Sequence, residues 1–138
     1  MKKIISFGEI LWDVFPDGKV LGGAPLNSAY YCSSLGADAK IVGAVGRDAN
    51  GMGALETMSA RGLSTELVSA NARPTGEAKV LLDSSGSATY EFLKDCAWDF
   101  IEYEPRAAEA AAHLPDLHTA AAHRVGSAQL SEGRDGAA

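Results

Sequence analysis

Residues 22–29 read Gly-Gly-Ala-Pro-Leu-Asn-Ser-Ala, the stretch on which the interpretation of the fold depends. The adjacent glycines Gly22 and Gly23 lack side chains, so the backbone can adopt dihedral angles closed to other residues and approach a ligand closely. Asn27 carries both an amide donor and a carbonyl acceptor, which suits a ligand rich in hydroxyl groups. A glycine pair alone is more often an ordinary turn, and Asn27 is also a common type of helix cap. The rest of the chain decides between these interpretations.

An apolar run precedes this stretch. Residues 4–11 are almost continuously apolar, the pattern of a strand covered on both faces in an α/β sheet. Asp13 would then lie near the carboxyl end of that strand, and ligands of open α/β sheets bind in the crevice outside such ends. Asp13 is therefore a candidate for contact with a ligand. The alternative interpretation is an ordinary aspartate in a turn or exposed to solvent.

Helices and strands alternate after the glycine pair. Pro25 suits the first turn of a helix and Gly36 its end, while Asp48 or Asn50 can cap a second helix. The expected elements are a helix over 25–35, a strand within 37–46, a helix over 51–61 and a brief strand over 63–69.

Two alternating segments, 77–83 and 88–93, predict a β-hairpin with a loop longer than two residues. Phe92 lies in the second segment, where ordinary hairpin packing is the competing interpretation. After Pro105 the sequence becomes rich in alanine. A helix is expected over 106–114, a strand over 123–130 and the start of a helix at Ser131.

The chain ends at Ala138, inside that last expected helix. Short helices draw most of their stability from packing against the rest of a protein. We therefore expect a truncated or fragmentary protein that forms a single domain over residues 1–138, since a chain of this length can bury one core.

Composition excludes several classes of function. The net charge of −6 is spread without blocks of like sign, so neither nucleic acid nor an anionic membrane is an expected partner. Cys32 and Cys96 lack the close-spaced partners of a zinc or redox motif, which favours a reduced, cytoplasmic protein. No apolar segment is long enough for a signal peptide or a membrane span.

Other motifs are also missing. The glycines of residues 43–46 stand three apart, where a dinucleotide fingerprint needs two, and no Gly-Lys-Ser or Gly-Lys-Thr of a P-loop occurs. The histidines His113, His118 and His123 lie five apart, off the spacing of a helical zinc site. We expect no metal site in this chain.

In their order and spacing, these features resemble the N-terminal half of the ribokinase-like carbohydrate kinases, also called the PfkB family. The fructokinase-like branch is the most similar, through Gly8-Glu9, residues 22–27 and Phe92-Leu93 leading to Ala97-Trp98-Asp99. The resemblance covers residues 1–99 well and residues 102–138 only by the order of elements. It implies an α/β fold: an incomplete ribokinase-like three-layer sandwich with a small β-hairpin lid over approximately 73–98.

The resemblance also implies a function, ATP-dependent phosphorylation of a sugar hydroxyl on fructose or a related ketose or sugar acid. Asp13 would accept hydrogen bonds from two neighbouring hydroxyls, Gly22 and Gly23 would present backbone groups, and Asn27 would bind another hydroxyl. Phe92, from the lid, would help to close the pocket. ATP and Mg²⁺ are implied as cofactors of the full-length parent, and lids that pair between subunits in the family imply a homodimer.

Two family motifs have no match in this sequence. One is the glycine-rich Asp-Thr-x-Gly-Ala-Gly-Asp segment that carries the catalytic base, and the other is the Asn-x-x-Glu motif linked with magnesium. The nucleotide-binding C-terminal half is missing as well. We therefore expect no catalytic residue in this chain and no turnover by it alone. A nucleoside kinase on the same scaffold, and a non-catalytic remnant that binds sugar weakly or associates with another chain, remain alternatives.

Overall fold

The structure is a computed structural model that describes residues 1–102 and 105–112. The expected strand over 123–130, the helix from Ser131 and the three histidines lie outside the described residues. The elements, in order, are β1 (Lys3–Phe7), β2 (Leu11–Phe15), β3 (Gly18–Gly22), α1 (Ala24–Ser34), β4 (Asp38–Gly46), α2 (Ala49–Ala60), β5 (Val68–Asn71), β6 (Gly76–Leu82), β7 (Ala88–Phe92), the 3₁₀ helix η1 (Ala97–Phe100) and α3 (Pro105–Ala112).

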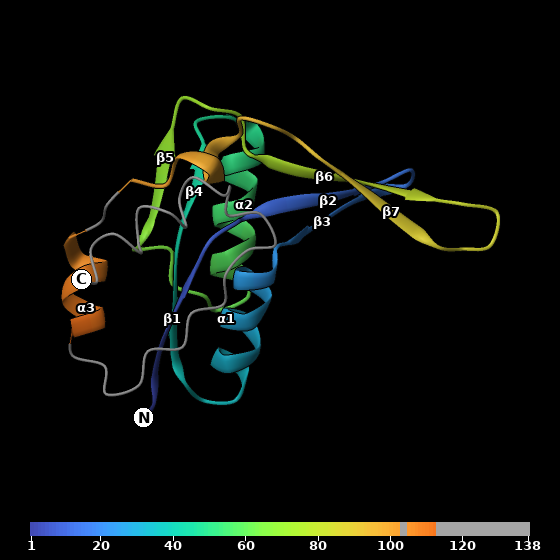
Figure 1. The fold of residues 1–138 in the computed structure, drawn as a ribbon. Coiled ribbons are helices and arrows are strands. Elements are labelled where there is room, and N and C mark those ends of the chain that lie inside the picture. The colour runs from blue at the N-terminus through green and yellow to red at the C-terminus, as the bar shows by residue number, and fades with distance from the viewer. Residues whose placement is uncertain (103–104, 113–138) are drawn as a thin grey trace, which may run out of the picture.

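The strands form two sheets. The main sheet has the order β1-β4-β5, and all of its pairs are parallel. The second sheet, here called the lid sheet, has the order β3-β2-β6-β7; β2 and β6 are parallel and the outer pairs are antiparallel. Figure 1 shows the lid sheet extending to one side of the main sheet and its helices.

Helices cover both faces of the main sheet, which gives the three layers expected of the sandwich (Figure 1). On one face, α1 and α2 bury a core that contains Leu26, Ile41 and Met58. On the other face, Ile5 and Val42 pack against Ala107 and Ala110 of α3. Residues 41–46 of β4 are all buried because both faces of this central strand are covered. The fold is therefore the mixed α/β arrangement that the sequence predicted.

The single strand expected over 4–11 is wrong: the chain forms two strands in two different sheets. β1 ends at Phe7, and Gly8, with a φ of 140°, turns the chain after donating a last hydrogen bond to Val42. β2 then begins at Leu11 in the lid sheet. The apolar run continues through the break because Ile10 is also buried, so periodicity alone does not reveal it.

Consequently, Asp13 lies in the middle of a lid strand and not beyond the end of a main-sheet strand. The lid is also larger than the expected hairpin, because β2 and β3 complete a four-stranded sheet with β6 and β7. The short strand expected over 63–69 is displaced to Val68–Asn71, and the earlier part contributes only a bridge between Lys40 and Ser64.

Helices α1 and α2 lie within two residues of their expected positions, and Asp48 is the cap of α2, where its side chain accepts a hydrogen bond of 2.7 Å from the Gly51 N–H. Asn50 lies in the first turn instead. Within the described residues, no helix has the length and apolar character needed to cross a membrane.

Candidate functional site

A cavity of about 560 Å³ lies where the start of α1 meets the lid sheet, and we call it the Asp13 cavity. Two acids and the glycine-rich start of α1 provide its polar lining: Glu9, Asp13, Gly23, Ala24 and Asn27. Its apolar lining comes from β2, β7 and η1: Leu11, Tyr90, Phe92 and Trp98. A cavity lined by a few polar groups and several aromatic rings has the usual composition of a small-molecule site.

Asp13 is half-buried on β2, opposite Val20 of β3. Its Oδ2 atom lies 2.5 Å from the point where a Cβ on Gly22 would sit, so the carboxylate occupies the space that this glycine leaves open. Burial raises the pKa of Asp13 above its ordinary value of 3.8, and no described charge or hydrogen-bond donor offsets this effect. The carboxylate is thus a partly desolvated acceptor without a partner of its own among the described residues.

The bend formed by Gly22 and Gly23, which we call the glycine bend, lies directly against Glu9. Gly23 has a φ of +111°, and a Cβ there would lie 2.5 Å from the Glu9 carbonyl oxygen, so only glycine fits. Gly23 supplies no side-chain cap to α1. Glu9, from an earlier segment of the chain, bonds the start of the helix instead: its Oε1 accepts a hydrogen bond of 3.2 Å from the Ala24 N–H.

Asn27 lies in α1, one turn beyond the bend, and its backbone N–H donates to the Gly23 carbonyl at 2.9 Å. Its side chain is exposed and lines the cavity. Because no described residue bonds its amide group, both the donor and the acceptor of that group are open to a ligand.

The lid contributes two rings from one face of β7. Tyr90 and Phe92 are two residues apart, which places their side chains on the same side of the strand. Their centroids lie 6.3 Å apart, with an interplanar angle of 27°. Trp98 of η1 is buried beside Gly76, where a Cβ would come within 2.6 Å of the Trp98 Cδ1. The aromatic side of the cavity therefore combines two partly exposed rings with one fixed ring.

The structure brings the sequence-predicted site residues together. Asp13, Gly23, Asn27 and Phe92 line the Asp13 cavity, and Gly22 adjoins it through the Asp13 carboxylate.

The prediction omitted five lining residues: Glu9, Leu11, Ala24, Tyr90 and Trp98. Tyr90 could have been found, because it shares a strand face with Phe92. Glu9 and Trp98 carried the family resemblance, but no local pattern indicated that they face a cavity.

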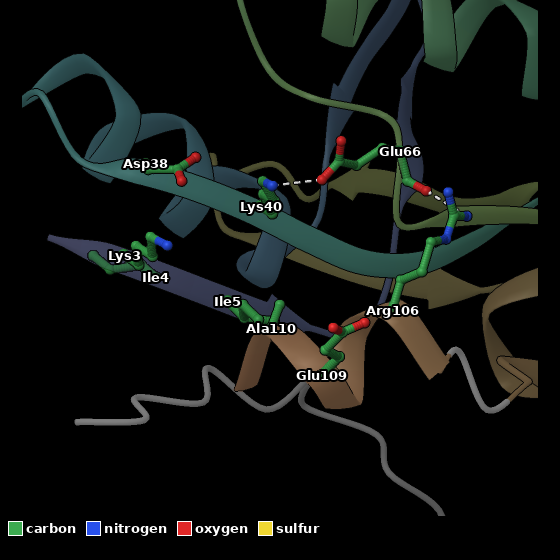
Figure 2. Close-up of a pocket in the computed structure, with 9 residues that line it drawn as sticks. All are labelled: Lys3, Ile4, Ile5, Asp38, Lys40, Glu66, Arg106, Glu109 and Ala110. Atoms are coloured by element: carbon green, nitrogen blue, oxygen red, sulfur yellow. Dashed lines mark hydrogen bonds and ion pairs between the residues drawn. The ribbon is translucent and has the colours of Figure 1, made fainter. Parts of the chain in front are cut away.

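A second hollow of about 330 Å³ lies between α3 and strands β1 and β4 (Figure 2), and none of the predicted site residues lines it. Its lining contains equal numbers of basic and acidic residues. The basic residues are Lys3, Lys40 and Arg106, and the acidic ones are Asp38, Glu66 and Glu109. Lys40 and Glu66 form an ion pair of 2.5 Å, and Arg106 donates to the Glu66 carbonyl at 3.0 Å. Of these two contacts, only the hydrogen bond from Arg106 joins α3 to the segment before β5.

No cluster of three metal-ligating side chains occurs within residues 1–102 and 105–112. None of the lining residues of the Asp13 cavity is basic, so this cavity provides no positively charged side chain for the phosphates of ATP. Cys96 is not a reactive thiol, because burial, followed by the nearby Asp99 charge, raises its pKa to about 12.

A three-layer α/β unit with a lid sheet beside a polar and aromatic cavity defines a protein of the ribokinase-like class. The sequence profile of the pfkB family of carbohydrate kinases matches residues 2–113, and the chain belongs to this family. The family resemblance read from residues 22–27 and their surroundings is thereby confirmed.

Solved structures agree with this assignment. An uncharacterised sugar kinase from Pyrococcus horikoshii gives a TM-score of 0.64 at 27% identity, over 71% of this chain and 36% of that protein. A fructokinase from Vibrio cholerae O395, solved with fructose, ADP and a calcium ion, gives a TM-score of 0.61 at 25% identity. The match covers 74% of this chain and 35% of that protein. A fructokinase from Xylella fastidiosa gives a TM-score of 0.67 at 22% identity, over 85% of this chain and 40% of that protein. At this identity the similarity concerns the fold alone.

The chain spans between 35% and 40% of the length of these three structures. A comparison with curated protein sequences finds no match.

Proposed function

We propose that the Asp13 cavity binds a sugar, and that this chain is the sugar-binding part of an ATP-dependent kinase that phosphorylates a sugar hydroxyl. One observation carries the proposal. The half-buried Asp13 carboxylate, the glycine bend and the Asn27 side chain meet at one cavity that aromatic rings also line. Hydroxyl groups satisfy the polar atoms of such a site, and the C–H faces of a sugar ring cover the aromatic rings.

Each group has a distinct task in this proposal. Asp13 accepts hydrogen bonds from two neighbouring hydroxyls, each contributing about 1.5–3 kcal/mol when shielded from water. Gly22 leaves room for the Asp13 carboxylate, Gly23 presents its main chain to the ligand, and Asn27 binds a further hydroxyl. Tyr90 and Phe92 close over the bound sugar with the lid sheet, which excludes water from the acceptor hydroxyl.

Fructose or a related ketose or sugar acid is the proposed substrate. Membership in the pfkB family and the fructose-bound Vibrio cholerae fructokinase support this choice. A nucleoside is the second candidate, favoured by the stacked pair Tyr90 and Phe92, because every base presents a flat face to such rings.

The catalytic base and the nucleotide site would come from outside the residues described here. We propose that the chain is a part of a longer kinase, with ATP and Mg²⁺ as its cofactors, and that by itself it holds sugar without turnover. The two free cysteines, Cys32 and Cys96, support a reducing, cytoplasmic location.

We also propose that the full-length protein forms a homodimer through the lid. β7 is an edge strand and all five of its residues are exposed, so its backbone groups can pair with a second strand. Analytical ultracentrifugation of the full-length protein should show a dimer. A compact monomer at all concentrations would contradict this part of the proposal.

The proposed function is tested by ADP release from the full-length protein with Mg²⁺, ATP and four acceptors: fructose, ribose, a sugar acid and adenosine. We expect turnover with fructose or with the sugar acid, and none by residues 1–138 alone. Turnover only with adenosine would favour the nucleoside kinase, and no turnover with any acceptor would favour the non-catalytic remnant.

A further inference from the structure

Glu9 is a buried acid that uses only one of its two oxygens. The residue is 6% exposed, and its Oε1 accepts the hydrogen bond from the Ala24 N–H. Its Oε2 is buried and has no hydrogen-bond partner within the described residues. A buried carboxylate oxygen without a donor is unfavourable, so such an atom calls for an explanation.

The position of Glu9 supplies that explanation. Glu9 lines the Asp13 cavity beside Gly23 and Ala24, at the N-terminus of α1. The partial positive charge at the start of this eleven-residue helix favours a carboxylate there. A ligand seated on the glycine bend would therefore lie next to Glu9, whose second oxygen lacks a donor within the described residues.

The charges of the cavity limit what that ligand can be. Its titratable lining residues are Glu9, Asp13 and Tyr90, and none of the nine residues that line it is basic. A carboxylate or phosphate on the ligand would face two acids in a partly desolvated space. A neutral hydroxyl, in contrast, can donate to either acid.

This inference rests on the proposed function and narrows it. We propose that Glu9 is a specificity-determining residue: its carboxylate accepts a hydrogen bond from a ligand hydroxyl, so the site selects an uncharged sugar over a sugar acid or a sugar phosphate. Of the proposed substrates, the neutral ketose is then preferred to the acid.

The test compares D-fructose with 2-keto-D-gluconate, which differs from it by a carboxylate at C1, in calorimetric titrations of the full-length protein. The wild-type protein should bind fructose at least about tenfold more tightly than the acid. Glu9→Gln keeps an oxygen for the Ala24 N–H but places an N–H donor where Oε2 stood. In this variant the preference for fructose should fall by about tenfold or more.

Glu56→Gln removes the same charge from an exposed position on α2 and should leave the preference unchanged. A Glu9→Gln protein that folds and keeps the wild-type preference would overturn the inference and leave Glu9 as a support for the bend. Should Glu9→Gln fail to fold, the wild-type titrations still test the inference, because equal affinity of the wild-type protein for the two sugars would overturn it. Binding of neither sugar would instead refute the proposed function itself.

Discussion

The Oδ2 atom of Asp13 lies 2.5 Å from the point that a Cβ on Gly22 would occupy. The register of the lid sheet explains this proximity. Gly22 pairs with Leu11, and Leu11 and Asp13 point to the same side of β2, so Asp13 and Gly22 are diagonal neighbours on one face. The absent side chain at Gly22 is therefore what allows the carboxylate to lie against the bend.

Gly22→Ala should weaken sugar binding, because the added methyl group would displace the Asp13 carboxylate. Loss of one charge-assisted hydrogen bond corresponds to about 1.5–3 kcal/mol, or roughly 10- to 150-fold in affinity. Calorimetric titration with fructose measures the change. Gly53→Ala is the matched control, since a Cβ there would make an ordinary contact of 3.5 Å with Trp12 and favour the helix. Equal affinities in the two variants would show that the space at Gly22 is not needed.

Asp13→Asn should raise the melting temperature at neutral pH. Burial raises the pKa of Asp13, so the folded protein holds a proton more tightly than the unfolded chain, and stability falls as the pH rises from 3.8 through the raised pKa. The asparagine has no charge to desolvate. Thermal unfolding followed by circular dichroism should show a positive difference at pH 7 that vanishes near about pH 3. A difference that is independent of pH would point to another cause.

Tyr90→Ala and Phe92→Ala should each weaken sugar binding by about 0.5–1.5 kcal/mol, the usual contribution of an aromatic contact. Stability should change little, because the two side chains are 53% and 36% exposed. Leu82→Ala removes a 61% exposed apolar side chain from the same sheet outside the cavity and serves as the control. If all three variants lose affinity equally, the rings have no special part in binding.

Asp48→Ala should destabilise the fold by about 1–3 kcal/mol, because it removes the cap of α2 and leaves buried Thr75 groups unpaired. The Asp48 carboxylate accepts hydrogen bonds from the Gly51 N–H at 2.7 Å, the Thr75 N–H at 3.0 Å and the Thr75 hydroxyl at 2.6 Å. Denaturant unfolding measures the cost. Asp83→Ala removes a similar set of hydrogen bonds from an exposed loop and should cost about 0.5 kcal/mol or less.

The contribution of Asp48 should also depend on pH. Burial alone would raise its pKa, but the hydrogen bonds from Thr75 and Gly51 outweigh burial and hold the pKa below 3.8. The contribution of Asp48 to stability is therefore complete at pH values above the pKa of the unfolded chain. It is lost as the pH falls through the lowered pKa of the folded protein. The stability difference between wild type and Asp48→Ala should shrink in strong acid, and a constant difference would contradict the hydrogen-bond account.

Local signals were enough to predict the helices and the bend. Pro25 and Gly36 bracket α1 and Asp48 caps α2, because these residues act on the backbone within a few positions. The strands depended on partners distant in the sequence. The apolar run of residues 4–11 hid the break at Gly8, and β3, which is mostly exposed, offered no pattern of its own.

The same distinction holds for the cavity. Asp13, the glycine pair and Asn27 were found through sequence, because the family motif joins them. Glu9 and Trp98 reach the cavity only through packing: Glu9 lies under Gly23, and Trp98 lies against Gly76. Contacts between distant segments of this kind leave no periodic trace in a single sequence.

Fructose binding by the full-length protein, compared between wild type and Asp13→Asn by calorimetric titration, tests the central claim most directly. Because the carboxylate is proposed to hold two hydroxyls, the affinity should fall at least about tenfold in the variant while the fold is kept. Wild-type affinity in a folded Asp13→Asn protein would contradict the account.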